Sequence, residues 1–174
     1  MTQSAMWSRR FVLGSVASLL LWPGFSQARP RTQTLFVIAR SSNANVLHYD
    51  VCFDDGRLDL DDPLLAYWVM RAEDGRREGL TWMERELAYG FRITSPVTPD
   101  GFRVVLKAFS QRELVVRKNA GGGYRATIRI DGKTATLDRI FVSIEGGGLT
   151  ATVRFVDLLG NSASGKRVSE RLVP

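Results

Sequence analysis

The chain has 174 residues, of which 24 are Lys or Arg, 18 are Asp or Glu, one is Cys and one is His. This length suits one domain, and a hydrophobic share of 44% beside a charged share of 24% excludes a wholly disordered chain. A single cysteine excludes an internal disulfide framework, and a single histidine excludes a metal site built from several histidines.

The first 28 residues have the pattern of an export signal. Arg9 and Arg10 precede a short apolar run over residues 11–22, and the segment ends in Ser-Gln-Ala at residues 26–28, a pattern that signal peptidases accept. Ser8 before the two arginines is typical of the twin-arginine signal, with an ordinary secretory signal as the alternative. The apolar run is too short to span a bilayer, so we expect cleavage and no transmembrane segment in the mature chain.

The mature domain, residues 29–174, is therefore expected in the periplasm or outside the cell. Its charge is uneven, because residues 29–90 carry 8 basic and 11 acidic groups whereas residues 91–174 carry 14 and 7. A basic half can attract phosphate-bearing lipids or polyanionic glycans, and the alternative is a solvated imbalance without a partner. Because the domain is expected outside the cytoplasm, we expect no nucleic-acid partner.

The first half of the mature domain predicts three strands. A short run of apolar, branched residues, then a segment that alternates apolar and polar residues, and then an aromatic-rich segment occupy residues 34–40, 46–53 and 64–71. In the second segment His48, Asp50 and Cys52 share one face, opposite the face of Tyr49.

One short α-helix is predicted next, over about residues 81–90. Thr81 and Glu84 have the spacing of a capping box, in which each side chain bonds a free amide of the first helical turn. Gly90 is suited to a left-handed cap at the helix end.

The second half predicts only strands. Asp131-Gly132 between two such runs indicates a tight hairpin. The runs themselves cover residues 102–109, 113–118, 124–131, 134–145, 149–158 and 166–173. Short strands at regular spacing favour a mainly β, single-domain antiparallel β-sandwich or barrel.

Three stretches together resemble the exported bacterial family known as domain of unknown function 4833. The similarity would extend from about residue 35 to residue 172, and it implies an exported, mainly β domain without supplying a catalytic residue. The residues that carry it are Arg40, Ser41, Asn43, Asn45, Val46, Tyr49 and Asp50, then Pro63, Tyr67 and Trp68, and finally Ala88, Tyr89 and Gly90.

These motifs leave two interpretations open. Ser and Asn side chains between strands commonly bond their own backbone and set turns, and aromatic side chains commonly fill the core. The alternative is a cleft that binds a carboxylate, sugar or peptide. The residues that would form it are Arg40, Ser41, Asn43, Asn45, Tyr49, Tyr67, Trp68 and Tyr89.

Metal and catalytic candidates are fewer. Asp54, Asp55 and Asp59 lie in a run of five carboxylates within nine residues, which suits calcium chemically but lacks the spacing of the known calcium loop. A solvated turn is the alternative interpretation, and no metal or cofactor is expected. His48 with Asp50 could bond or share a metal.

A last candidate is a basic surface. Arg125, Thr127 and Arg129 share one face of their predicted strand, and Arg103 and Lys107 can share a side of another. If these strands are neighbours, their outer faces form a basic patch, with ordinary solubilising charge as the alternative.

The favoured hypothesis is a non-catalytic envelope domain that binds a small molecule, a glycan or a protein. The alternative is a hydrolase of envelope glycan or lipid that uses Asp50 and Glu84 together with His48, which requires these groups to converge on one substrate site.

Overall fold

The computed structural model describes residues 31–146 and 152–174, and the predicted signal lies outside these residues. Almost all of this part is strand. The strands are β1 (Arg31–Arg40), β2 (Val46–Asp54), β3 (Arg57–Leu58), β4 (Leu64–Val69), β5 (Arg77–Gly79), β6 (Phe91–Ile93), β7 (Gly101–Leu106), β8 (Phe109–Lys118), β9 (Tyr124–Ile130), β10 (Lys133–Glu145), β11 (Thr152–Ser162) and β12 (Arg167–Leu172). The mainly β, single-domain prediction is confirmed.

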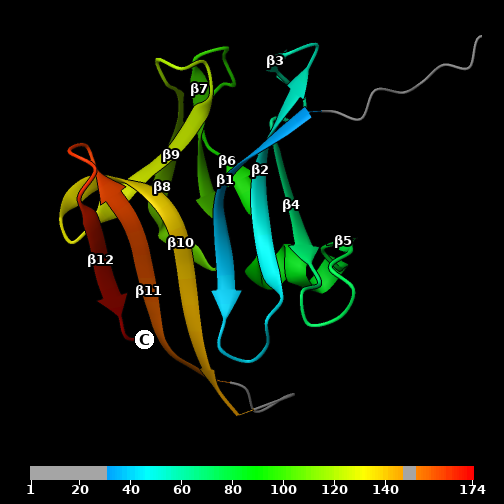
Figure 1. Ribbon diagram of the computed structural model, residues 1–174, viewed down its shortest axis with the longest axis vertical. Helices are drawn as coiled ribbons and strands as arrows, with labels where there is room; N and C mark the ends of the chain where they lie inside the picture. The colour runs from blue at the N-terminus through cyan, green and yellow to red at the C-terminus, as the bar shows by residue number, and fades with distance from the viewer. Residues whose placement is uncertain (1–30, 147–151) are drawn as a thin grey trace, which may run out of the picture.

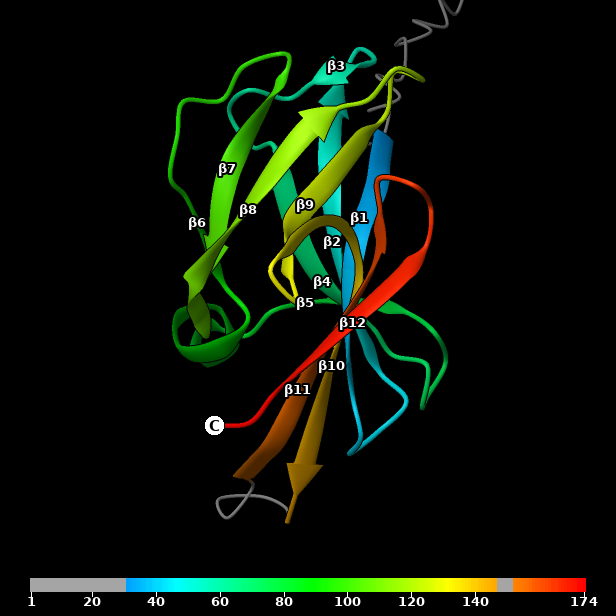
Figure 2. The ribbon, with the colours of Figure 1, turned by 90° about the vertical axis from the view of Figure 1, so that its left-hand side faces the viewer.

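The strands form one curled sheet, a half-barrel. Its main path runs β5-β4-β2-β1-β10-β9-β8-β7-β6, while β11 and β12 extend from β10, and β3 pairs with β2. The long strand β10 pairs with β9 near residues 133–136 and with β1 near residues 139–142. Figures 1 and 2 show how the curl brings β6–β9 across from β1, β2 and β4.

The sheet is mixed, which corrects the antiparallel prediction at one place. β1 runs parallel to β10, with Val37 opposite Arg139 and Arg40 opposite Val142. The other strand pairs are antiparallel. This single parallel pairing joins the start of the domain to its second half, and local sequence patterns cannot predict it because the paired residues are about a hundred positions apart.

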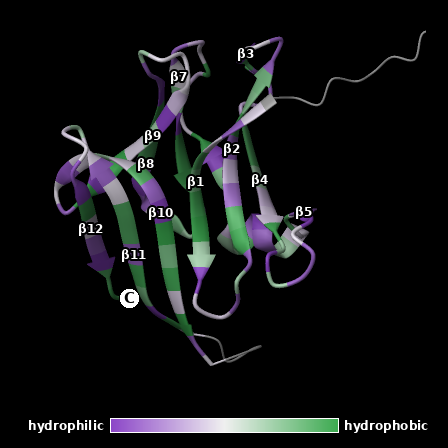
Figure 3. Cartoon of the chain, in the orientation of Figure 1, coloured by the Kyte–Doolittle hydropathy of each residue, from purple (hydrophilic) through white to green (hydrophobic). Residues whose placement is uncertain are grey.

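The core fills the concave side of the half-barrel. Phe36 of β1 stacks on Tyr49 of β2 with ring centroids 4.6 Å apart, and Tyr49 meets Phe91 of β6 edge-on at 6.5 Å. At the other end Phe53 of β2 packs against Tyr124 of β9 at 5.8 Å. Hydrophobic and hydrophilic residues are interleaved along the strands (Figure 3), as a sheet with one buried face requires.

The predicted hairpin is confirmed. Ile130 pairs with Lys133, and the two residues between them, Asp131 and Gly132, have φ of 48° and 73°. Two successive positive φ values define the turn that matches the twist of antiparallel strands.

The helix is shorter than predicted and of another type. Helical residues span 82–88, and Glu84–Ala88 form a π-helix. The capping box is present, because the Thr81 amide donates to Glu84 Oε2 at 3.0 Å and the Glu84 amide donates to Thr81 Oγ1 at 3.3 Å. No helix in the described part of the chain is long and apolar enough to cross a membrane.

Gly90 ends the helix for a reason other than the predicted left-handed cap. Its φ is not among the positive values of the chain. A Cβ at this position would lie 1.8 Å from the carbonyl oxygen of Arg85. The glycine is therefore required by close backbone approach.

Candidate functional site

Four of the residues predicted to bind a ligand meet inside the half-barrel, beside the helix. The guanidinium carbon of Arg40 lies 4.3 Å from the ring centroid of Trp68 and 5.9 Å from that of Tyr89. Trp68 and Tyr89 meet edge-on at 5.3 Å, and the Tyr49 hydroxyl donates to the Tyr89 carbonyl at 2.6 Å. We call Arg40, Tyr49, Trp68 and Tyr89 the arginine–aromatic cluster.

Glu84 joins this cluster to the helix. The Trp68 Nε1 donates to Glu84 Oε1 at 3.0 Å, and Glu84 Oε2 accepts from the Thr81 hydroxyl at 2.9 Å. The capping box that begins the helix thus also holds the helix against β4.

The cluster leaves little aromatic surface for a ligand. Tyr49 is fully buried and Trp68 is 4% exposed, and burial raises the pKa of the Tyr49 hydroxyl far above its ordinary value. Arg40 is half-buried, its guanidinium has one weak hydrogen bond among the described residues, at 3.5 Å to the Tyr89 hydroxyl, and its Nε is buried without a partner there. These contacts support a packing role for the aromatic residues.

Ser41, Asn43 and Asn45 bond the backbone. Asn43 Oδ1 accepts from the Asn45 amide at 3.1 Å, and Asn45 Oδ1 accepts from the Ala72 amide at 2.9 Å. The Ser41 hydroxyl donates to the Ile144 carbonyl at 3.1 Å and accepts from its amide at 2.8 Å. The geometry therefore favours the turn-setting interpretation for all three residues.

Tyr67 belongs to a different group, on the outer face of the sheet. Its hydroxyl donates to Asp50 Oδ2 at 2.8 Å, and the Thr34 hydroxyl donates to Asp50 Oδ1 at the same distance. Its ring lies between His48, at 5.5 Å, and the guanidinium of Arg77, at 4.6 Å. We call Thr34, His48, Asp50 and Tyr67 the outer polar cluster.

Burial sets the protonation behaviour of the outer polar cluster. Asp50 is 2% exposed and Tyr67 is 5% exposed. Burial, helped by the bond to Asp50, raises the pKa of Tyr67 to about 12. Burial also lowers the pKa of His48, against the opposing attraction of Asp50. The alternation of β2 predicted a shared face for His48 and Asp50, but it contained no signal that this face is covered.

The three groups of the predicted hydrolase do not converge. Neighbouring strand residues point to opposite faces of a sheet, and Glu84 bonds Trp68 whereas Asp50 bonds the adjacent Tyr67. Glu84 therefore lies across the sheet from His48 and Asp50.

The calcium candidates do not converge either. Among the described residues no three His, Cys, Asp or Glu side chains gather as a metal ion would require. Asp59 Oδ1 instead accepts the amides of Asp61 and Asp62, both at 3.0 Å. This is an ordinary turn in which the side chain bonds the following backbone.

The second half of the chain brings Arg103, Arg125 and Arg129 of the predicted basic surface to neighbouring strands, whereas Lys107 follows β7 and is paired with Glu86. β7, β8 and β9 are neighbours, and together they carry six Arg or Lys residues and one acid, Glu113. The outer side chains that define this basic face are exposed, and they are Arg103, Arg117, Arg125 and Arg129.

Arg117 and Arg125 lie directly opposite each other across the β8–β9 pair. Like charges in this position are destabilising. Neither arginine has an ion-pair partner in the described part of the chain, whereas Arg103 is paired with Glu113 at 2.8 Å.

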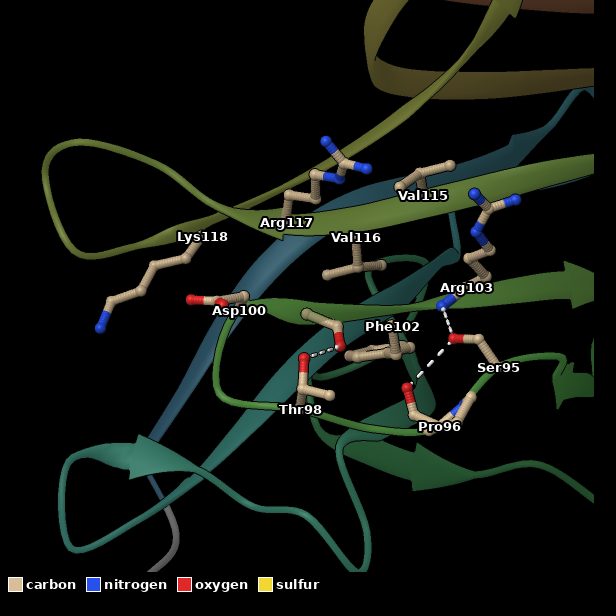
Figure 4. A pocket seen from close by; sticks show the side chains of 11 residues that line it. Ser95, Pro96, Thr98, Asp100, Phe102, Arg103, Val115, Val116, Arg117 and Lys118 are labelled. Carbon is tan, nitrogen blue, oxygen red and sulfur yellow. Dashed lines mark hydrogen bonds between the residues drawn. The ribbon is translucent and has the colours of Figure 1, made fainter.

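A groove of about 530 Å³ adjoins the basic face. Arg103, Arg117 and Lys118 line it, with Asp100 as the acidic residue of its wall. Figure 4 shows these side chains around the groove, with the Ser95 hydroxyl accepting from the Arg103 amide at 2.9 Å. Sequence analysis did not single out Arg117, Lys118 or the loop before β7, because their proximity depends on strand pairing.

A comparison with protein families gives a match over most of the described chain. The family model described as Domain of unknown function (DUF4833) matches residues 36–171. Neither the curated proteins nor the solved structures contain a match to this chain.

Proposed function

This chain belongs to the DUF4833 family, a domain of unknown function, and we propose that it is a binding domain of the cell envelope whose basic face recognises an anionic ligand. The observation that carries the proposal is the direct opposition of Arg117 and Arg125 beside the groove. The ligand is a small molecule, a glycan or a protein segment that bears phosphate or carboxylate groups.

The charge arrangement fits such a ligand. An anion between Arg117 and Arg125 would turn a repulsive pair into two attractive contacts, and guanidinium groups bind phosphate and carboxylate oxygens in matched pairs. Lys118 adds a third positive charge along the groove wall. The β8–β9 pairing fixes the backbone positions from which Arg117 and Arg125 extend.

The proposed location is the periplasm or the cell exterior. It depends on the leader, where Ser8, Arg9 and Arg10 precede the apolar run and Ala28 marks the expected cleavage site. Changing Arg9 and Arg10 to Lys blocks export if the twin-arginine route operates, and unchanged secretion would instead assign the general route.

A binding role is favoured over hydrolysis by the positions of the acidic groups. Glu84 is held by Trp68 and Thr81, and Asp50 is enclosed by Thr34 and Tyr67 on the other side of the sheet. The two carboxylates therefore face opposite sides of the sheet and do not meet at one substrate site.

The binding experiment titrates the protein with pyrophosphate and with heparin, a polyanionic glycan, by calorimetry. We expect the double variant Arg117→Gln/Arg125→Gln to bind at least about tenfold more weakly than the wild type, since each charge-assisted contact contributes on the order of 1 kcal/mol or more. Arg57→Gln/Arg154→Gln is the matched control, because it removes the same charge from exposed positions on β3 and β11. If both variants lose the same amount of affinity, the loss comes from net charge, and the basic face is not the binding site.

A further inference from the structure

The short helix presents its large apolar side chains to solvent. Trp82 is 74% exposed, Met83 is 62% exposed and Leu87 is 73% exposed. We call these three residues the apolar patch. Single exposed apolar residues are ordinary, but three large ones gathered on one helical segment mark an interaction surface.

The patch is held in place by the fold. The Lys107 amide donates to the Gly90 carbonyl at 2.9 Å, and the Ala108 amide donates to the Ala88 carbonyl at 3.2 Å. Glu84 and Tyr89 fix the other side of the segment through Trp68 and Tyr49. Because the inward side of the helix is engaged, a small rotation cannot bury the apolar patch.

Two cations on or next to the helix have no acidic partner among the described residues, whereas its acids are bonded to neighbours. Glu86, the exposed acid of the helix, is paired with Lys107 at 2.6 Å. Arg85 on the helix and Arg92 just after it are exposed, and the described residues offer neither an ion-pair partner. An exposed apolar patch with unpaired arginines on and just after its helix complements a negatively charged surface.

The size of the patch decides between possible occupants. A stable protein interface buries roughly 800 Å² on each partner, from about 20–30 residues, whereas a large aromatic side chain buries about 150–250 Å². Three side chains are therefore too few for a stable dimer. They suffice for shallow insertion into a lipid surface, where tryptophan is enriched and nearby cations meet anionic headgroups.

We propose that the apolar patch docks the domain on a bilayer surface that contains anionic lipids. Trp82, Met83 and Leu87 enter the headgroup region, while Arg85 and Arg92 contact lipid phosphates. This inference is independent of the proposed ligand site, because the groove lies at the start of β7 and the helix contacts the residues after its end.

The experiment measures the depth of Trp82 in vesicles. The full chain is mixed with vesicles of 30% phosphatidylglycerol and 70% phosphatidylethanolamine that carry brominated acyl chains, which quench nearby tryptophan. Subtracting the signal of Trp82→Phe isolates Trp82 from the other three tryptophans. We expect the Trp82 signal to fall by at least half, and to fall less than one-fifth with phosphatidylcholine vesicles.

Substitutions test the patch as a unit. We expect Trp82→Ser/Leu87→Gln to partition into the anionic vesicles about tenfold more weakly than the wild type. The control Leu60→Gln/Val173→Gln changes residues that are 50% and 74% exposed elsewhere on the domain. This control should change the partition coefficient by less than twofold. An unquenched Trp82 overturns the proposal, as does equal quenching in phosphatidylcholine. Sedimentation gives the third outcome. If the wild type self-associates and Trp82→Ser/Leu87→Gln does not, the patch binds a second copy of the chain instead of a bilayer.

Discussion

The guanidinium carbon of Arg40 lies 4.3 Å from the ring centroid of Trp68, on the concave side of the half-barrel. The two residues come from strands that are not adjacent, since β2 separates β1 from β4. A cation stacked on a buried indole contributes about 0.5–2 kcal/mol, and the aliphatic part of the arginine adds packing.

The first prediction concerns this contact. Arg40→Ala is expected to lower the free energy of unfolding by about 1–3 kcal/mol, because it removes both the cation and the packed stem. Arg40→Met keeps much of the stem and is expected to recover part of the loss. Urea unfolding measures both values, and an Arg40→Met protein as stable as the wild type would show that the charge contributes nothing.

A second prediction follows from the close approach at Gly90. Gly90→Ala places a Cβ 1.8 Å from the Arg85 carbonyl oxygen, so the backbone must move and the helix end loses its position. We expect the free energy of unfolding to fall by more than about 2 kcal/mol, as is typical of strained backbone sites. Gly79→Ala is the control, since an added Cβ there meets nothing within 4 Å. Similar melting temperatures for the two variants would contradict the assigned role.

The outer polar cluster gives a third prediction. Tyr67→Phe removes one of the two hydroxyl donors to the buried Asp50 and leaves a carboxylate oxygen unsatisfied, which costs about 1–3 kcal/mol. Tyr89→Phe is a suitable control, because its hydroxyl has only a 3.5 Å contact with Arg40. In chemical denaturation, Tyr67→Phe should have a clearly lower free energy of unfolding than Tyr89→Phe. The reverse order would refute the hydrogen-bond network around Asp50.

The fourth prediction is a pH dependence of stability. Arg112 and the Asp131 amide bond Glu170 and lower its pKa from 4.5 to about 2. Because the folded-state pKa is depressed, this stabilisation is complete above pH 4.5 and is lost as the pH falls toward 2. A shift of this size corresponds to at most about 3.4 kcal/mol, and water at the partly exposed pair reduces that value.

Glu170→Gln tests this pH dependence. In this variant the free energy of unfolding is expected to fall less steeply than in the wild type as the pH is lowered from 4.5 to 2. Glu145→Gln should leave the limb unchanged, because its pair with Arg154 is largely exposed, with side chains 67% and 63% accessible. Identical acid limbs for wild type and Glu170→Gln would show that the pair does not couple folding to pH.

Local sequence patterns predicted much of the strand content and one turn in detail. Apolar runs and alternation located strands close to β1, β2 and β4, and Asp131-Gly132 predicted the hairpin before β10. They missed β3, β5 and β6, which have two or three residues each. Such short strands are defined by their partners, so their own sequence holds too few residues to show a period.

The candidate site could be predicted only in part. The motif residues Arg40, Tyr49, Trp68 and Tyr89 do meet, but Ser41, Asn43 and Asn45 bond backbone and Tyr67 faces the opposite side of the sheet. Residue alternation settles which face a side chain takes along one strand. It cannot show what lies on the next strand or what covers the face.

The sequence by itself determined a single β-rich domain, a basic second half and the spacing of the capping box. Composition, alternation and capping are local properties, and each acts within a few residues of chain. Only the tertiary structure decided that Arg117 faces Arg125, that Asp50 is buried, and that Trp82 and Leu87 are exposed. These relationships depend on strand order and on the curl of the sheet, which place residues distant in sequence at contact distance.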